Sequence, residues 1–373
     1  MRPDRDGSRQ ALRDTSRVLI AGGGTGGHAI PALCVADELH ARGATVKFIG
    51  STAGIEASVV PKAGYVLHAL PLVGLSGGPL VRARASLLFL RALSRCYWIL
   101  QEYRPGSVLG VGGYASAPAV LAASLLKIPT FLHEQNSVPG RANRLASRFT
   151  RGVFTTFPAA SSRLRRAAVV GMPTRKEFFG RSKEEALKGL ALSPPVVLIF
   201  GGSGGALKLN LAATDAFRGE TPYSIFHISG RRDFSRLSTN NPRHRIVPYE
   251  DELWRPLAAA DVVVMRAGAG SLFDVAAMGR AAILIPYPYA TGDHQLYNAR
   301  YFTEKGAAAL LADYEVTPNS LRTCVEGLLG DATHRERLAE KMQDLATPGA
   351  ASEVAEKLLE AANEKGERPS RYT

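Results

Sequence analysis

Residues 18–28 read VLIAGGGTGGH, an apolar run followed by a loop with five glycines and a histidine. The residues that come next, Pro31–Arg42, have the periodicity of a helix. A buried strand that leads through a glycine-rich turn into a helix is typical of the first unit of a parallel α/β sheet. The stretch therefore predicts a Rossmann-like start to the chain.

The same plan recurs along the chain of 373 residues, which is long enough for two domains. Apolar runs that do not alternate with polar residues are separated by helical patterns, and they predict parallel sheets covered on both faces. These runs are residues 18–21, 46–50, 107–111, 129–133, 196–200, 223–229, 245–249, 261–265 and 282–286. We expect an α/β protein with two doubly wound parallel-sheet domains.

The pattern also predicts the domain limits. An N-terminal domain would cover residues 17–168, a linker 169–175 and a C-terminal domain 176–348. Residues 1–16 are charged and have no apolar core, so they are expected to be a disordered tail and not a signal peptide. Residues 349–373 begin with a helical pattern and end in a charged tail. The uncharged stretch 105–126 contains four glycines and an internal proline, which favour strand, loop and helix over a membrane span.

Charge is distributed unevenly. The chain has 46 Lys and Arg against 33 Asp and Glu, and the whole net charge of +13 lies within residues 1–170. A basic half predicts a polyanionic partner. No segment interleaves aromatic and basic residues as nucleic-acid-binding motifs do, so an anionic membrane surface is favoured over nucleic acid. The segment 80–95, with four arginines among apolar residues, and Arg141 and Arg144 are candidates for this surface.

Three widely spaced cysteines fit neither a disulfide framework nor a zinc site, which favours a reducing, cytoplasmic compartment.

Three glycine loops follow apolar runs, at residues 22–28, 110–116 and 201–206. Glycine lets backbone N–H groups approach a ligand, and a helix N-terminus favours an anion. Three such loops at the ends of parallel strands predict a cleft for a phosphorylated ligand. The only Asp-x-Asp pattern lies in the tail, at Asp4 and Asp6, so neither a metal nor a cofactor is expected.

Other motifs fit less well. The first loop matches a dinucleotide fingerprint, but Gly50 and Ser51 stand where a ribose-binding acid is needed. His28 replaces the lysine of a Walker A loop. Residues 201–205 match the nucleophile elbow G-x-S-x-G, with Asp274 and His294 downstream in hydrolase order. A serine hydrolase that uses Ser203 therefore remains an alternative.

Together these motifs closely resemble the MurG family, the UDP-N-acetylglucosamine transferases that act on a muramoyl lipid in peptidoglycan synthesis. The resemblance covers residues 17–345 in order and with the family's spacing. The matching segments are GGTGGH at 23–28, GVGGYAS at 110–116, HEQN at 133–136, GMPTR at 171–175, GGSGGA at 201–206, RAGAGSLFD at 266–274 and DHQ at 293–295.

The resemblance implies the GT-B fold, two Rossmann-like domains that face a deep cleft, with UDP-GlcNAc held by the C-terminal domain. Arg175 and Ser203 would contact the diphosphate, the backbone near Glu250 the uracil, and Asp274 the ribose. His294 and Gln295 would read the sugar hydroxyls. The remaining implied donor contacts are Thr25, Gly26, Gly27, Asn136, Ala269, Gly270, Ser271, Leu272 and Phe273.

The N-terminal domain would then bind the lipid-linked acceptor. The implied contacts to its diphosphate are Gly26, Gly27, Gly112, Gly113, Tyr114 and Ser116. His28 is the candidate general base, and the adjacent helix N-terminus favours its neutral form. A plain capping role for His28 is the alternative. Three positions depart from the family pattern: Asp274 replaces Glu, Met172 replaces Asn and Gly204 replaces Gln.

We thus expect an inverting, metal-independent glycosyltransferase that converts lipid I (undecaprenyl-diphospho-MurNAc-pentapeptide) and UDP-GlcNAc to lipid II and UDP. It would be a peripheral protein at the cytoplasmic face of the inner membrane. Another UDP-sugar transferase of the same fold with a lipid acceptor is the second alternative.

Overall fold

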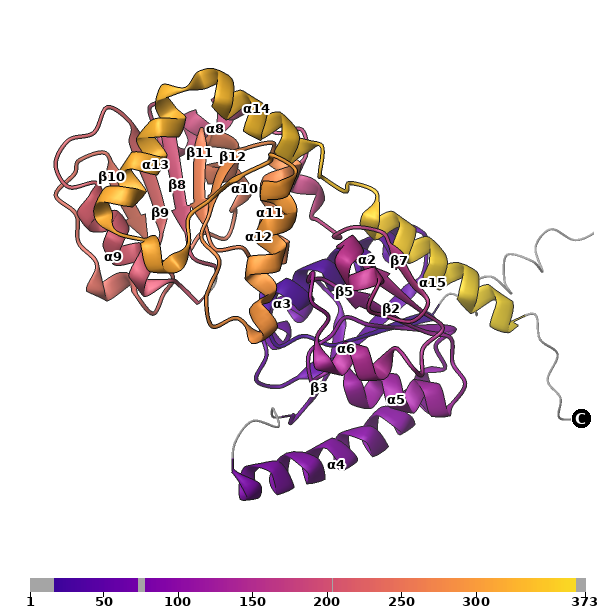
Figure 1. Cartoon of the computed structure of the whole chain (residues 1–373). Coiled ribbons are helices and arrows are strands. Elements are labelled where there is room, and N and C mark those ends of the chain that lie inside the picture. The colour runs from indigo at the N-terminus through magenta and orange to yellow at the C-terminus, as the bar shows by residue number, and fades with distance from the viewer. Residues whose placement is uncertain (1–16, 73–77, 203, 367–373) are drawn as a thin grey trace, which may run out of the picture. The chain divides into compact units, whose positions relative to one another are not determined.

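The computed structural model describes residues 17–72, 78–202 and 204–366, which form two compact α/β units (Figure 1). The first unit contains residues up to Pro173 together with those from Gly349 onward, and the second is Thr174–Pro348. The tail predicted at residues 1–16 lies outside the described residues, as does Ser203.

The first unit is built on a seven-stranded parallel sheet of order β3-β2-β1-β4-β5-β6-β7. Its strands are β1 (Arg17–Ala21), β2 (Thr45–Ser51), β3 (Val66–Leu70), β4 (Ser107–Gly110), β5 (Thr130–Glu134), β6 (Gly152–Thr155) and β7 (Ala167–Val169). Its helices are α2 (Gly26–Ala41), α3 (Glu56–Lys62), α4 (Pro79–Tyr103), α5 (Ala117–Leu125), α6 (Arg141–Ala146), α7 (Pro158–Ser161) and α15 (Ala350–Gly366).

Strand β1 shows why the apolar runs do not alternate. Val18 and Ile20 face the core beneath α2 and α15, while Leu19 and Ala21 face the core beneath α4 and α5. Both faces of the strand are buried, and each fully buried aliphatic side chain of this size stabilises the fold by about 1.5–3 kcal/mol.

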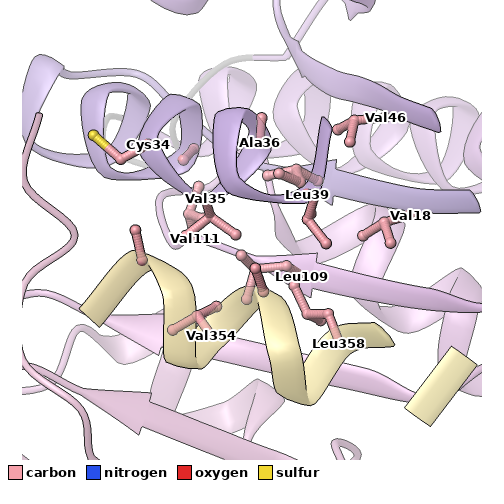
Figure 2. Close-up of a cluster of buried hydrophobic side chains, with 14 of the residues drawn as sticks. Val18, Cys34, Val35, Ala36, Leu39, Val46, Leu109, Val111, Val354 and Leu358 are labelled. Atoms are coloured by element: carbon pink, nitrogen blue, oxygen red, sulfur yellow. The ribbon is translucent and has the colours of Figure 1, made fainter. Parts of the chain in front are cut away.

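Helix α15 comes from the far end of the chain and completes the core of the first unit. Figure 2 shows Val354 and Leu358 packed toward Leu109 of β4 and Val111, with Val18 and Leu39 beyond them. The side chains of Val354 and Leu358 are fully buried. The first unit is therefore assembled from two segments that the second unit separates in the sequence.

The second unit has a six-stranded parallel sheet of order β10-β9-β8-β11-β12-β13. Its strands are β8 (Val196–Phe200), β9 (Ser224–Ile228), β10 (His244–Val247), β11 (Val262–Met265), β12 (Ala281–Leu284) and β13 (Ala309–Leu310). Its helices are α8 (Lys183–Leu190), α9 (Leu207–Ala216), α10 (Trp254–Ala259), α11 (Ala269–Met278), α12 (His294–Glu304), α13 (Pro318–Gly330) and α14 (Ala332–Gln343), with the 3-10 turn η1 (Lys176–Phe178).

Both sheets reverse strand order at one point, between β1 and β4 in the first unit and between β8 and β11 in the second. The loops that leave these strands diverge to opposite faces of the sheet, which leaves a crevice at the carboxyl ends of the strands where ligands of such folds bind. All three predicted glycine loops begin at strands beside these two points, because they follow β1, β4 and β8.

The predicted fold class of two doubly wound parallel α/β units is confirmed. Strands β3, β6, β7 and β13 have no counterpart among the predicted runs. Strands β3, β7 and β13 lie at or next to a sheet edge and are half exposed, so they lack the apolar pattern of a central strand. The uncharged stretch 105–126 forms β4, a glycine loop and α5. Among the described residues, no helix is both long and apolar enough to cross a membrane.

Candidate functional site

In the first unit, the loop between β1 and α2 has a backbone that suits glycine. Gly22, Gly23 and Gly24 have φ of 136°, 146° and 92°, a region that L side chains rarely adopt. Thr25 is the N-cap of α2, and its carbonyl accepts hydrogen bonds from the backbone of His28 and Ala29. The N–H groups of Gly26 and Gly27 therefore lie in the first turn of a helix that has no side-chain cap and no acid.

The loop after β4 packs directly on this first loop. A Cβ atom on Gly22 would stand 2.7 Å from the carbonyl of Gly112, and one on Gly113 would stand 2.6 Å from the carbonyl of Gly23. Gly112 and Gly113 themselves have φ of 94° and 73°. The glycines thus allow two backbones to meet at the β1–β4 switch point.

The side chain of His28 lies against the contact between these two loops. Thr25 Oγ1 and His28 Nδ1 are 2.8 Å apart and share a hydrogen bond. A Cβ atom on Gly112 would be 3.1 Å from His28 Nε2 and 3.3 Å from Asn143 Nδ2, so the imidazole and the Asn143 amide converge over Gly112. The structure therefore brings the predicted residues Thr25, His28 and Gly112 together.

The end of β5 supports the same region through a buried carboxylate. Glu134 accepts hydrogen bonds from the backbone N–H groups of Asn136 and Gly140, both at 3.0 Å, and from Asn143 Nδ2 at 2.9 Å. Burial raises the pKa of Glu134, and these hydrogen bonds oppose the shift. Burial also lowers the pKa of His133 to about 4, so this imidazole is neutral near pH 7. Asn136 is held at the same end of the sheet as His28.

Two other predicted residues of the first unit differ in exposure. The side chain of Tyr114 is 38% exposed and can contact a ligand. Ser116 is 2% exposed, and its hydroxyl donates to the carbonyl of Gly113 at 3.0 Å. In this conformation Ser116 therefore closes the loop on itself.

In the second unit, the loop from Gly201 to Ala206 leads from β8 into α9. Gly205 N–H donates to the carbonyl of Gly202 at 3.0 Å. A Cβ atom on Gly204, where the family pattern has Gln, would meet no atom within 4 Å. Met172, which departs from the family pattern in the segment 171–175, is 1% exposed within the first unit.

Helix α11 follows β11 across the β8–β11 switch point. Its N-cap is Gly268, which supplies no side-chain hydrogen bond, and Leu272 N–H is the first to reach an intrahelical acceptor, the carbonyl of Gly268. The N–H groups of Ala269, Gly270 and Ser271 thus form the open end of the helix dipole. Leu272 is fully buried and Phe273 is 2% exposed, so only backbone atoms of these two residues can face a ligand.

Asp274 and Arg175 influence each other at this end of the second unit. Desolvation raises the pKa of Asp274 to about 7, although the positive charge of Arg175 opposes the shift. Arg175 lies with its guanidinium carbon 4.5 Å from the ring centre of Phe178, and its Nη1 is 3.5 Å from Glu177 Oε1. Its buried Nε has no hydrogen-bond partner among the residues that the structure describes. A cation with an unsatisfied donor near a carboxyl group of raised pKa is a suitable site for an anionic ligand.

The remaining predicted donor residues lie after β10 and at the start of α12. Glu250 follows β10, and its carboxylate accepts from the backbone of Glu252 at 3.0 Å. Gln295 Oε1 accepts from the backbone of Tyr287 at 3.0 Å, and His294 Nδ1 is 2.9 Å from the carbonyl of Thr291. A hydrolase triad needs an acid on the histidine Nδ1, and here that nitrogen bonds a backbone carbonyl. This geometry disfavours the alternative based on Ser203.

Sequence reasoning missed two buried residues at these loops. Asn143 lies next to His28 and Glu134, and Glu56 bonds the first glycine loop. Neither belongs to a glycine motif. Asn143 stands between Arg141 and Arg144, which indicated a basic surface, and Glu56 is a single acid among small and apolar residues.

The comparisons with known proteins agree with this arrangement. Residues 18–155 match the glycosyltransferase family 28 N-terminal domain and residues 196–358 match the glycosyltransferase family 28 C-terminal domain. The chain belongs to glycosyltransferase family 28 and is a glycosyltransferase.

Two proteins that are similar to this chain have the same functional name. A protein of Rubrobacter xylanophilus is 64% identical over 333 residues, which is 88% of this chain and 99% of the relative. A protein of Desulforudis audaxviator is 36% identical and covers 94% of this chain and all of the relative. Both are UDP-N-acetylglucosamine--N-acetylmuramyl-(pentapeptide) pyrophosphoryl-undecaprenol N-acetylglucosamine transferases.

Crystal structures give the same picture. MurG from Acinetobacter baumannii is 28% identical, with a TM-score of 0.73 over 92% of this chain and 99% of that one. The UDP-GlcNAc 2-epimerase of Neisseria meningitidis matches with a TM-score of 0.65 over 92% of this chain and all of that one, but at 14% identity this likeness concerns the fold alone. The expected MurG resemblance and GT-B fold class are confirmed.

Proposed function

We propose that the chain transfers N-acetylglucosamine from UDP-GlcNAc to the C4 hydroxyl of the muramoyl sugar of lipid I, giving lipid II and UDP. The observation that carries this function is the 64% identity, over 99% of its length, to the N-acetylglucosamine transferase of Rubrobacter xylanophilus. The function places the enzyme in peptidoglycan synthesis.

On the donor side, the second unit offers a group for each part of a nucleotide sugar. Arg175, with its unsatisfied Nε, binds the diphosphate together with the open N–H groups of α11. Asp274 accepts from the ribose hydroxyls, and the backbone near Glu250 binds the uracil. Gln295 and His294 bind the sugar hydroxyls from the start of α12. Ser203, Gly270 and Ser271 complete the diphosphate contacts.

On the acceptor side, His28 is the general base. In the tautomer in which Nδ1–H donates to Thr25 Oγ1, Nε2 carries the lone pair that takes the proton from the C4 hydroxyl. Gly26, Gly27, Gly112 and Gly113 bind the acceptor diphosphate through N–H groups, with Tyr114 beside them.

The reaction is a single displacement at the anomeric carbon. The C4 oxygen attacks as its proton passes to His28, the bond to the UDP oxygen breaks, and the α-linked donor yields a β-linked product. Negative charge develops on the leaving diphosphate, where Arg175 and the α11 dipole stabilise it. The proposal assigns this stabilisation to residues of the chain itself, and it therefore expects transfer without an added metal ion.

The test measures UDP release from UDP-GlcNAc with and without a lipid I analogue, in EDTA, for the wild type and His28→Ala. We expect acceptor-dependent release that survives EDTA and falls about 100- to 10,000-fold in His28→Ala, as loss of a general base requires. His40→Ala, an exposed histidine on the same helix, is the control and should retain activity. Full activity of His28→Ala would refute the assignment of the base.

The same assay separates the alternatives. A serine hydrolase would lose activity in Ser203→Ala and react with a serine-directed phosphonate, whereas the transferase keeps its acceptor-dependence and is not labelled. If UDP-GlcNAc binds but no lipid I analogue stimulates release, the acceptor assignment is wrong and a different lipid acceptor is indicated.

We also propose that the first unit rests on an anionic membrane, which would make the enzyme peripheral at the cytoplasmic face of the inner membrane. Helix α4 supports this proposal. Its buried face includes Ala85, Ala92, Cys96, Ile99 and Leu100. The opposite face mixes exposed apolar and basic side chains, namely Arg84, Leu87, Leu90, Arg91, Arg95 and Trp98. We call these six residues the α4 outer face.

The exposed apolar residues of the α4 outer face have large side chains. Leu90 and Trp98 are 62% and 63% exposed, which is costly in water and favourable at a lipid interface. A hollow of about 390 Å³ near α6 adds positive charge, and the predicted residues Arg141 and Arg144 line it together with Arg148, Arg163 and Arg165. Such a basic, partly apolar surface suits lipid headgroups with negative charge.

A further inference from the structure

Glu56 is an acid buried against the loop that the proposed base depends on. It opens helix α3 and is 1% exposed. Its Oε2 accepts a hydrogen bond from Gly24 N–H at 2.6 Å, and its Oε1 accepts one from Ser51 N–H at 2.8 Å. The carboxylate therefore ties the first glycine loop to the end of β2.

Three glycines form the space that this carboxylate occupies. A Cβ atom on Gly23 or Gly54 would overlap the carboxyl group of Glu56, and one on Gly50 would lie 2.6 Å from its Cγ. The requirement for glycine at these positions is thus set by a side chain of the protein itself. At the end of β2, where the sequence has Gly50 and Ser51 and no acid, a carboxylate is supplied by Glu56 from the following helix.

The charge of Glu56 also makes one end of the loop less favourable for an anion than the other end. Gly24 N–H is already bonded to a carboxylate, and a phosphate at that point would face a like charge. The N–H groups of Gly26 and Gly27, at the start of α2, have no such neighbour in the hydrogen bonds of the described residues. The anion is therefore directed to the end of the loop that carries His28.

We propose that Glu56 is a positioning residue for His28, an inference that rests on the proposed role of His28 as the base. Gly24 is joined directly to Thr25, whose carbonyl starts α2 and whose hydroxyl bonds His28 Nδ1. Fixing Gly24 thus fixes Thr25, and Thr25 holds the imidazole in the tautomer and orientation that expose Nε2 to the acceptor. Glu56 touches neither substrate and acts through the backbone.

The first experiment compares Glu56→Gln and Glu56→Asp with the wild type in the UDP-release assay. The amide of Glu56→Gln presents an N–H group to one of two N–H donors, so the loop loses a bond and gains a repulsion. We expect kcat to fall about 10- to 100-fold, with a much smaller loss of affinity for UDP-GlcNAc, since most of the proposed donor contacts lie in the second unit. Glu56→Asp keeps both acceptors and should recover part of the loss. Glu360→Gln, an exposed acid of α15 paired with Lys357, is the control.

The decisive experiment is a double-mutant cycle with His28→Ala. If Glu56 acts through His28, Glu56→Gln should lower kcat by less than about threefold when His28 is already absent. Equal losses in both backgrounds, or wild-type kcat in Glu56→Gln alone, would overturn the positioning role while leaving the base intact. Wild-type kcat in His28→Ala would overturn the base and the positioning role together.

A second variant covers the case in which Glu56→Gln does not fold. Gly50→Ala keeps the carboxylate and crowds its Cγ, so it should displace Glu56 and give the same dependence on His28 in the cycle. An unchanged melting temperature of the first unit, which contains both Gly50 and Glu56, shows that the variant is folded. A Gly50→Ala protein of wild-type kcat in which the cycle shows no coupling would contradict the inference.

Discussion

Burial and the neighbouring cation of Arg175 shift the pKa of the Asp274 carboxyl group in opposite directions. Desolvation raises its pKa to about 7, and Arg175 limits the rise. Near pH 7 a part of the protein molecules therefore carries a proton on Asp274, the group that we propose accepts from the ribose hydroxyls. In the proposed site, binding of the nucleotide sugar should release this proton, because a carboxylate accepts two hydroxyl donors better than a neutral acid does.

The affinity for UDP-GlcNAc should consequently depend on pH. As the pH falls below about 7, the apparent dissociation constant should rise toward tenfold per pH unit, and above about 8 it should be constant. Isothermal titration calorimetry in two buffers of different ionisation enthalpy measures both the affinity and the released proton. A flat profile with no proton release would show that Asp274 does not bind the ribose as a carboxylate.

Asp274→Asn supplies the control, since an amide does not titrate. Its affinity should be lower than that of the wild type at pH 8 and independent of pH. Stability should depend on pH in the opposite direction to affinity. The pKa of Asp274 in the folded protein lies above the unfolded value of 3.8, so the neutral carboxyl group stabilises the wild type at low pH. This stabilising effect is lost as the pH rises toward 7. The variant should therefore melt at a higher temperature than the wild type at pH 8.

At the scale of single residues, the sequence provided candidates where a motif surrounds them. His28, Asp274 and Gln295 each belong to a dense run of motif residues next to a strand end. Glu56 and Asn143 were not predictable, because a lone acid or amide in a mixed segment has the same sequence signature as a solvated side chain. Their function depends on which backbone N–H or side chain lies opposite, and the fold alone brings those groups together.

At the scale of elements, the long apolar runs predicted the central strands because burial on both faces leaves no polar positions. Hydrophobic patterns could not predict which side chains of α11 face the core and which face a ligand. Leu272 and Phe273 belong to a motif associated with the nucleotide, yet the register of the helix turns both side chains into the core. His227 and His244 form a buried stacked pair with ring centres 5.4 Å apart, which their positions in the sequence did not indicate.

The α4 outer face should control binding to lipid vesicles. We expect Arg91→Gln/Arg95→Gln to bind phosphatidylglycerol vesicles about 30-fold more weakly at low salt, since each basic residue near an anionic surface contributes about 1 kcal/mol. Sedimentation with vesicles measures the bound fraction, and neutral phosphatidylcholine vesicles should show little difference between the variant and the wild type.

Arg218→Gln/Arg337→Gln removes the same charge from the second unit and is the matched control. Equal losses in the two double variants would mean that the overall charge, and not the α4 outer face, governs binding. UDP-GlcNAc affinity should be unchanged in both proteins.

At the scale of the whole molecule, the sequence did not indicate that α15 packs against the core of the first unit. A helical pattern at 350–366 shows that an apolar face exists but not which core it joins. In the structure its side chains lie with Val18 and Leu109.

Leu358→Ala should therefore destabilise the first unit by about 2–5 kcal/mol, the usual cost of truncating a fully buried leucine. Hydrogen exchange should show faster exchange in β1, β4 and α2, with β8 and β11 unaffected. Leu359→Ala changes a partly buried neighbour on the same helix and should have a smaller effect. Faster exchange in the strands of the second unit would contradict the division of the chain.

The position of α15 also sets an order for folding on the ribosome. The second unit is continuous in the chain and can fold as soon as it is synthesised, but the first unit has to wait for its last helix. At about 5–20 residues per second, translation of the intervening unit takes roughly 10–35 s. During that time the apolar groove that receives Val354 and Leu358 is open on the nascent chain, so it is the surface that a chaperone would meet first.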